Sequence, residues 1–339
     1  MCRHVCPIGN ATGLERNTAR ARAFGVSLVA RGATELAELA DNIYECSLCG
    51  ACTNNCVTGF DPKVFVNEVK TEIVLEGLAP SYINALLMKV GECGNVYGAK
   101  VPEALAELEN NGADTVLFAG LDAWAKADAC VLDAMKLLKS ADNKIGLVLG
   151  DSGFALHFLT GRTEETRAAA EAMSARLSNY KTVVVYDPED LALIRHEWRE
   201  WGIEPACNIV SFNEYLLSLI ESGALKVKMS DAEYTLQDSF AYARELDDDK
   251  SGRALIAKVG TPREMLLIGK EANLAGHLVM NEYMPEVIEK VAKNRWRDAV
   301  NMGCTALVTE CPAEYVALKS TAPEGCRVLS IEEMLLENM

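Results

Sequence analysis

Four cysteines of the segment 44–59, YECSLCGACTNNCVTG, are spaced as C-x2-C-x2-C-x3-C: Cys46, Cys49, Cys52 and Cys56. Three thiolates two residues apart can wrap one face of an iron-sulfur cube, whereas the fourth points toward a different cluster. The spacing therefore predicts a [4Fe-4S] centre and a partner motif elsewhere in the chain. Residues 1–7, MCRHVCP, fit that partner, since Cys2, Cys6 and Pro7 are typical of the end of the same pattern, cut short by the start of the chain.

The composition limits the class of protein. The chain has 339 residues, a formal net charge of -16 and 12 cysteines, without a signal-peptide pattern or an apolar run long enough to span a membrane. We therefore expect a cytoplasmic protein that does not insert into a membrane and does not bind nucleic acid, whose phosphates require a basic surface. Cysteines in such a chain are more often metal ligands or reduced core thiols than disulfides. The six outside the two motifs are expected to be inert core thiols: Cys93, Cys130, Cys207, Cys304, Cys311 and Cys326.

Helices are expected to position the two cysteine motifs. The stretch 11–43 lacks strand alternation and forms helices, with Asn17 or Thr18 as an N-cap, and further helices follow from Pro62. Glycines in the segment 94–100 interrupt this pattern. An all-α cluster-binding domain is thus predicted over residues 1–97.

The remainder alternates short apolar runs with amphipathic helices, which predicts parallel α/β units. The expected strands are DTVLFAG, KIGLVLG, KTVVVYD and NIVSF in residues 98–225, and EYTLQ, EMLLI, ALVTE and RVLSI in residues 226–339. The two series have a similar order and suggest a duplication. The predicted fold class is therefore α + α/β, with a helical domain followed by two α/β repeats.

With these motifs and this layout, the chain resembles the iron-sulfur subunits related to heterodisulfide reductase, glycolate oxidase and anaerobic glycerol-3-phosphate dehydrogenase. The resemblance implies an N-terminal α-helical ferredoxin domain and two cysteine-rich CCG-type repeats. Of the cysteines that the family pattern places in the repeats, only Cys311 is present, and Asp187 or Pro188 stands near the last pair of the first repeat. The repeats are therefore degenerate. They lack the thiolates that noncubane clusters require, so disulfide-reducing chemistry is not expected.

The resemblance also implies a ligand set. In the family, the first three cysteines of one motif join the fourth of the other motif. This rule places one cluster on Cys46, Cys49 and Cys52 with Cys6, and leaves Cys2 and Cys56 in an incomplete second site. Three explanations stay open: the second cluster is lost, which we favour; unusual or partner-supplied ligands complete it; or residues upstream of Met1 do.

Three residues of the repeats are weaker candidates for catalysis: His277, Glu282 and Cys311. A histidine near carboxylates can perform acid-base chemistry, although such a histidine is more often a hydrogen-bonded structural residue. Asp187 and Asp190 follow a predicted strand, where carboxylates are frequently helix N-caps.

The leading hypothesis is an electron-transfer subunit of an oxidoreductase complex, not a self-sufficient enzyme. A cubane carries one electron at a time, whereas hydride chemistry needs a flavin or nicotinamide. By resemblance the partner in this hetero-oligomer is a flavin-dependent dehydrogenase of the glycolate or lactate oxidase type, or an electron-transfer flavoprotein, in anaerobic metabolism. One alternative is an oxidoreductase active site in the cleft between the repeats, to which the cluster supplies electrons. The other is a structural protein whose cluster only holds the N-terminal helices together.

Overall fold

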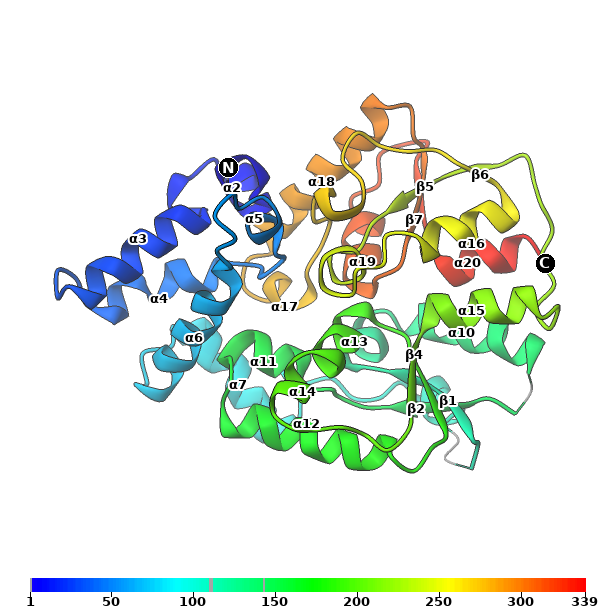
Figure 1. Cartoon of the computed structure of the whole chain (residues 1–339), viewed down its shortest axis with the longest axis horizontal. Helices are drawn as coiled ribbons and strands as arrows, with labels where there is room; N and C mark the ends of the chain where they lie inside the picture. Colours follow the sequence, from blue (N-terminus) through cyan, green and yellow to red (C-terminus); the bar gives the residue numbers. More distant parts are fainter. Residues whose placement is uncertain (1, 110–111, 143) are drawn as a thin grey trace.

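The computed structural model describes residues 2–109, 112–142 and 144–339, and the side chain of Cys2 lies outside the described part. The N-terminal helices lie on one side of two α/β repeats that are placed one above the other (Figure 1). In the described part, no helix has the length and apolar character needed to cross a membrane.

The N-terminal region is helical, as predicted, and the described residues contain no strand before Thr115. Thr18 is the N-cap of its third α-helix, and its side chain accepts a hydrogen bond from the amide of Ala21. Asp61 caps the sixth helix in the same way, with Pro62 at the first helical position. The elements are α1 (Cys2–Val5), α2 (Pro7–Thr12), η1 (Glu15–Asn17), α3 (Ala19–Ala30), α4 (Leu36–Tyr44), α5 (Ala51–Asn54), α6 (Pro62–Leu75) and α7 (Ser81–Cys93).

The first repeat is built on a parallel sheet with strand order β2-β1-β3-β4. Its strands are β1 (Thr115–Ala119), β2 (Gly146–Leu149), β3 (Thr182–Val185) and β4 (Asn208–Ser211). The apolar runs of β1, β2 and β3 are buried because helices cover both faces of the sheet. The helices of this repeat are α8 (Glu103–Ala106), α9 (Leu121–Lys126), α10 (Asp128–Ala141), α11 (Phe154–Thr160), α12 (Glu164–Leu177), α13 (Pro188–Arg195), α14 (Glu197–Glu200) and α15 (Phe212–Glu221).

The second repeat has the corresponding strand order, β6-β5-β7-β8, and is also parallel. This match in topology agrees with the duplication suggested by the sequence. Its strands are β5 (Glu233–Gln237), β6 (Thr261–Pro262), β7 (Ala306–Thr309) and β8 (Arg327–Ser330). The other elements are the π-helix η2 (Ala241–Glu245), α16 (Ser251–Val259), the 3-10 helix η3 (Gly269–Glu271), α17 (Leu278–Asn281), α18 (Pro285–Asn301), α19 (Pro312–Ser320) and α20 (Ile331–Glu337).

One predicted strand is wrong. The run EMLLI at 264–268 is a loop, and the edge strand β6 lies just before it. Only Met265 is buried, whereas Leu266 is 78% exposed and the next two residues are also exposed. The apolar composition suggested a core strand, but most of these side chains face outward.

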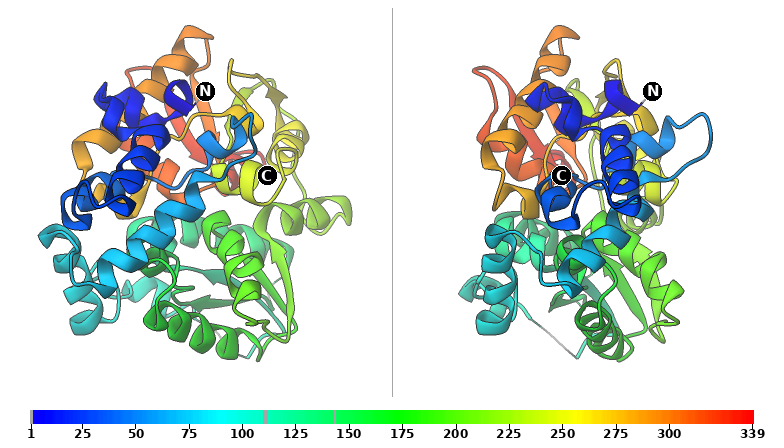
Figure 2. Two further views of the ribbon diagram at one scale, coloured as in Figure 1. Left: turned by 60° about the vertical axis from the view of Figure 1, so that its left-hand side comes forward. Right: turned by 90° about the vertical axis from the view of Figure 1, so that its left-hand side faces the viewer.

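The N-terminal region contacts both repeats (Figure 2). Helix α6 packs against α11 of the first repeat, and α2 packs against α18 of the second. The hydroxyl of Tyr44 donates to the carbonyl oxygen of Leu159 at 2.9 Å, and the hydroxyl of Tyr283 donates to the carbonyl oxygen of Tyr44 at 2.8 Å. The cysteine loop that follows Tyr44 is therefore held between the two repeats.

Candidate metal centre

Four cysteines line one small cavity: Cys6, Cys46, Cys49 and Cys52. Cys6 is the N-cap of α2, and the other three belong to the segment that connects α4 to α5 and to the start of α5. The loop winds tightly because Leu48 and Gly50 both have positive φ, at 52° and 70°. Such a conformation is uncommon for a residue with a side chain, so Leu48 marks a constrained turn between two of the cysteines. The tertiary structure thus brings together the set that the resemblance implied.

Burial in the cavity disfavours the free thiolate form of two of the cysteines. Burial raises the pKa of the Cys6 thiol to about 11. The pKa of the Cys52 thiol is also raised, mainly by burial and to a smaller extent by the charges of the neighbouring cysteines. Cys6 and Cys52 are thus held protonated until a metal displaces their protons. The amide of Gly9 donates to the Cys6 sulfur at 3.4 Å, a contact that stabilises a thiolate.

Two buried cations lie beside the cysteines. Arg22 is 1% exposed and lines the same cavity, and its Nη2 atom has no hydrogen-bond partner. Its other nitrogens donate to the carbonyl oxygens of Asn17 at 2.6 Å and Asn42 at 2.9 Å. Lys70 is fully buried and donates to the carbonyl oxygen of Phe158 at 2.8 Å. Burial lowers the pKa of Lys70 to about 7, an effect that the nearby Cys46 opposes.

The two buried cations bear on whether an iron-sulfur cluster fits the cysteine cavity, because they need a counter-ion. Buried charges without a counter-ion are costly, and among the described residues no carboxylate forms an ion pair with Arg22 or Lys70. A cluster ligated by four thiolates carries negative charge and would supply the missing counter-ion. The donor set and the unpartnered guanidinium nitrogen therefore both fit a [4Fe-4S] cluster.

The predicted second cluster site is less complete than the four-cysteine cavity. Cys56 does not line the cysteine cavity, and its sulfur lies 3.2 Å from the hydroxyl of Thr58. Hydrogen bonds from Thr58 lower the pKa of Cys56. The side chain of Cys2 is outside the described part, so its role stays a prediction.

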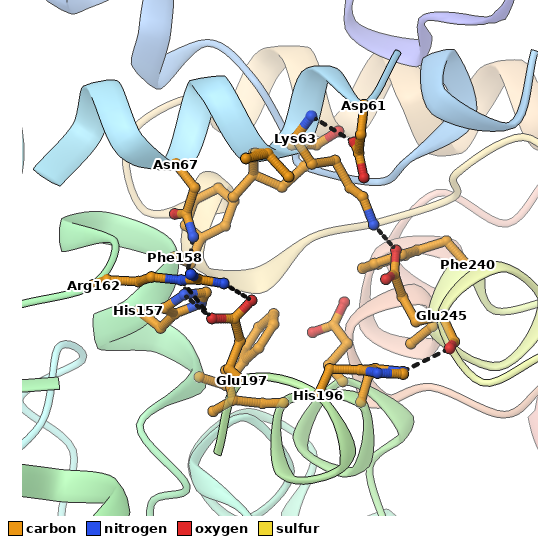
Figure 3. Close-up of a pocket in the computed structure, with 18 of the residues that line it drawn as sticks. Asp61, Lys63, Asn67, His157, Phe158, Arg162, His196, Glu197, Phe240 and Glu245 are labelled. Atoms are coloured by element: carbon orange, nitrogen blue, oxygen red, sulfur yellow. Dashed lines mark hydrogen bonds and ion pairs between the residues drawn. The ribbon is translucent and has the colours of Figure 1, made fainter. Parts of the chain in front are cut away.

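A larger cavity of about 480 Å³ adjoins the cysteine loop (Figure 3). Its lining comes from the loop at Ser47 and Leu48, from α6 and from both repeats. Three of the four histidines of the chain contribute: His157, His196 and His277. Burial lowers the pKa values of His157 and His277 to about 3, so both rings are neutral near pH 7. Motif reasoning missed this cavity, since its residues come from distant segments.

Several charged side chains of the cavity are paired with one another (Figure 3). Lys63 forms an ion pair with Glu245, and Arg162 donates to Glu197 at 2.9 Å. The ring of His157 is 2.9 Å from the side-chain nitrogen of Asn67. These pairs link α6 to both repeats and fix the cavity wall.

The three weaker catalytic candidates are placed apart. His277 lines the large cavity, caps α17 through Nδ1 and leaves Nε2 unpartnered. Glu282 does not line that cavity and instead accepts from Lys126 at 2.6 Å. Cys311 is buried before α19 and also lies outside that cavity's lining. The structure therefore does not gather these three residues into one constellation.

Comparison with known proteins supports an iron-sulfur domain in this part of the chain. Residues 1–60 match the family described as the 4Fe-4S dicluster domain. The chain has an N-terminal 4Fe-4S dicluster domain and is an iron-sulfur protein related to a subunit of an oxidoreductase.

A distant homologue covers most of the chain. It is one component of the dihydromethanophenazine:CoB-CoM heterodisulfide reductase of Methanosarcina acetivorans. The two proteins are 24% identical over 316 residues, which are 86% of this chain and 76% of that protein. The name of this relative indicates that it is one subunit of a heterodisulfide reductase with several subunits.

Two solved structures are similar in part. The crystal structure of a hypothetical protein from Helicobacter pylori superposes on 92% of this chain with a TM-score of 0.56 and 13% identity, and this chain spans 66% of its length. This likeness shows the fold alone. Glutamate racemase isoform RacE1 from Bacillus anthracis covers 67% of this chain and 80% of its own length at 12% identity, with a TM-score of 0.32 that is too low to show a common fold.

Proposed function

We propose that this chain is an electron-transfer subunit whose [4Fe-4S] cluster is held by Cys6, Cys46, Cys49 and Cys52. When bound, the cluster supplies one-electron redox chemistry. The chain's own residues hold the sulfurs in one cavity and place buried positive charge beside them. We place the complex in the cytoplasm, with a flavin-containing dehydrogenase or an electron-transfer flavoprotein as the partner.

The observation that carries this proposal is the cavity that gathers four cysteines beside the buried Arg22, and exposed apolar side chains near the cluster loop indicate where a partner would dock. Val57, which follows the last cysteine of the motif, is 96% exposed. The loop that contains the exposed Leu266 reaches the same region, because Asn55 on one segment donates to Glu271 on the other at 3.1 Å. Exposed apolar side chains from two distant segments are typical of a protein interface. Docking here would bring a partner's flavin close to the cluster.

Charge substitutions in this surface test the proposal. V57D and L266D are expected to slow electron exchange with the proposed flavin-containing partner by about 10-fold or more, since each buries a charge in the interface. Reduction of a small artificial dye by the same variants should stay unchanged, because the dye needs no docking surface. Met229→Asp, on a side chain that is also exposed, is the control. Unchanged flavoprotein rates in both variants would refute this docking surface.

A second candidate function rests on the large cavity. It contacts the cluster loop at Ser47 and Leu48 and contains the unpartnered Nε2 of His277. A small substrate bound there would lie next to the redox centre, as the active-site hypothesis requires. Isolated protein that oxidises or reduces a small substrate with a dye, and with no flavoprotein present, would favour this function over the first.

A further inference from the structure

The two repeats place related tetrapeptides at equivalent positions. Asp187-Pro-Glu-Asp follows β3 and opens α13, and Cys311-Pro-Ala-Glu follows β7 and opens α19. Both prolines occupy the first turn of their helix. Strands β3 and β7 hold the same position in sheets of the same order. Asp187 and Cys311 are therefore counterparts in the duplication.

These counterparts meet between the repeats. One carboxylate oxygen of Asp187, one of Glu189 and the sulfur of Cys311 all lie within 4.8 Å of one another. The three residues are 1%, 2% and 2% exposed. The amide of Glu189 donates to Oδ1 of Asp187 at 3.0 Å, which fixes the aspartate side chain at the helix start. Two carboxylates of the first repeat thus face one thiol of the second.

Glu189 lacks the partners that a buried carboxylate needs. Both of its oxygens are buried without a hydrogen-bond partner. One oxygen each of Asp122 and Asp190 is also buried and unpartnered, and the charges of Asp187, Asp122 and Asp190 act on Glu189. Among the described residues, no ion pair brings a lysine, arginine or histidine to Glu189. Unpaired buried carboxylates cost several kcal/mol, so this arrangement favours a bound cation.

We propose that Asp187, Glu189 and Cys311 bind a single divalent transition-metal ion of the zinc type between the two repeats. Zinc accepts both carboxylate oxygen and thiolate sulfur, and its tetrahedral site can take three protein ligands and a water. Magnesium and calcium prefer oxygen alone, which makes the thiolate an unsuitable ligand for them. The site is separate from the cysteine cavity, since none of its three residues lines that cavity.

The ion has a route to this site. Glu189 also lines the large cavity, which adjoins the cluster loop. An ion held by Glu189 therefore lies beside that cavity, and it joins α13 of the first repeat to the segment before α19 of the second. The bound ion is expected to stabilise the contact between the repeats.

The test uses the full-length protein purified anaerobically with its cluster and supplied with Zn²⁺. X-ray absorption at the zinc edge is expected to show one sulfur at about 2.3 Å and oxygens at about 2.0–2.2 Å. Zinc with four sulfur neighbours would mean occupation of the cysteine cavity and would overturn the proposal, as would protein that retains no zinc. This measurement on the wild-type chain does not depend on any variant folding.

Variants then identify the ligands. C311S is expected to remove the sulfur signal, and E189Q to weaken zinc retention at least 10-fold. Cys304→Ser is the matched control, since Cys304 is an equally buried thiol of the same repeat and lies outside the cluster of ligand atoms. Iron content should stay unchanged in all three variants, which separates this site from the iron-sulfur cluster. A sulfur neighbour that persists in C311S would overturn the assignment.

Discussion

The guanidinium group of Arg244 donates a hydrogen bond to the backbone carbonyl oxygen of Cys49 at 2.8 Å. Arg244 belongs to η2 in the second repeat, 195 residues from the cysteine loop. The same side chain donates to the carbonyl oxygen of Lys270 at 2.8 Å and also to that of Ala272. One arginine therefore joins the cluster loop to the exposed loop beside it. The degenerate repeat has kept a structural role around the metal centre.

Removing this arginine should make the cluster more labile. R244M is expected to speed the loss of the cluster's visible absorbance in air by about 10-fold, since groups that orient metal ligands commonly contribute that much to metal retention. The measurement is the decay rate of that absorbance after exposure to air. R167M, on an exposed arginine of α12 that pairs with Glu171, is the control and should decay as the wild type does. Equal decay rates in all three proteins would contradict the structural role of Arg244.

Iron analysis should separate the cysteines into two groups. C49S is expected to lose the cluster, because its sulfur lines the cysteine cavity. C56S is expected to keep about four iron atoms per chain, since Cys56 lies outside that cavity. About eight iron atoms in the wild type, falling to about four in C56S, would instead show a second cluster that uses Cys56.

The buried lysine should tune the redox potential. At a pH below 7, where Lys70 is charged, K70M removes a positive charge near Cys46 and is expected to lower the reduction potential on the order of 50 mV, because the added electron loses a favourable interaction. A redox titration followed by electron paramagnetic resonance gives the value. Lys293→Met, on the exposed face of α18, should leave the potential unchanged. An upward shift in K70M would contradict this account.

Stability should depend on pH through Glu332. This residue is buried, accepts a hydrogen bond from Tyr186 at 2.7 Å, and has a pKa that burial raises to about 7. Between about pH 4.5 and 7 the unfolded chain is ionised at this position while the folded chain keeps its proton. The free energy of unfolding therefore falls as pH rises through this range, on the order of 3 kcal/mol from this group.

The variant E332Q isolates that contribution. Glutamine does not titrate, and its amide oxygen can still accept from Tyr186. Guanidinium denaturation between pH 5 and pH 8 should show a smaller fall in stability for E332Q than for the wild type. Parallel curves for the two proteins would show that Glu332 does not titrate as described.

Local patterns predicted several features correctly. Thr18 was one of two residues expected to cap a helix, and it does so because its hydroxyl can satisfy a free amide of the first turn. Asp187 is likewise an N-cap, as expected for a carboxylate after a strand. The alternation of apolar runs with helices predicted parallel sheets, and both sheets are parallel. The strand predicted at 264–268 is wrong, because the apolar composition of this run does not reveal that Leu266 faces outward.

The sequence by itself determined the chemistry of the N-terminal motif, since the C-x2-C-x2-C spacing lets three neighbouring sulfurs face one cluster. Only the tertiary structure decided what surrounds it. Lys70 and Arg244 come from separate helical segments and meet the cysteine loop through packing that no local pattern encodes. Asp187 could be read as a simple helix cap until folding placed it beside Glu189 and Cys311. The physical reason is that spacing acts within a loop, whereas burial and charge pairing depend on contacts between distant segments.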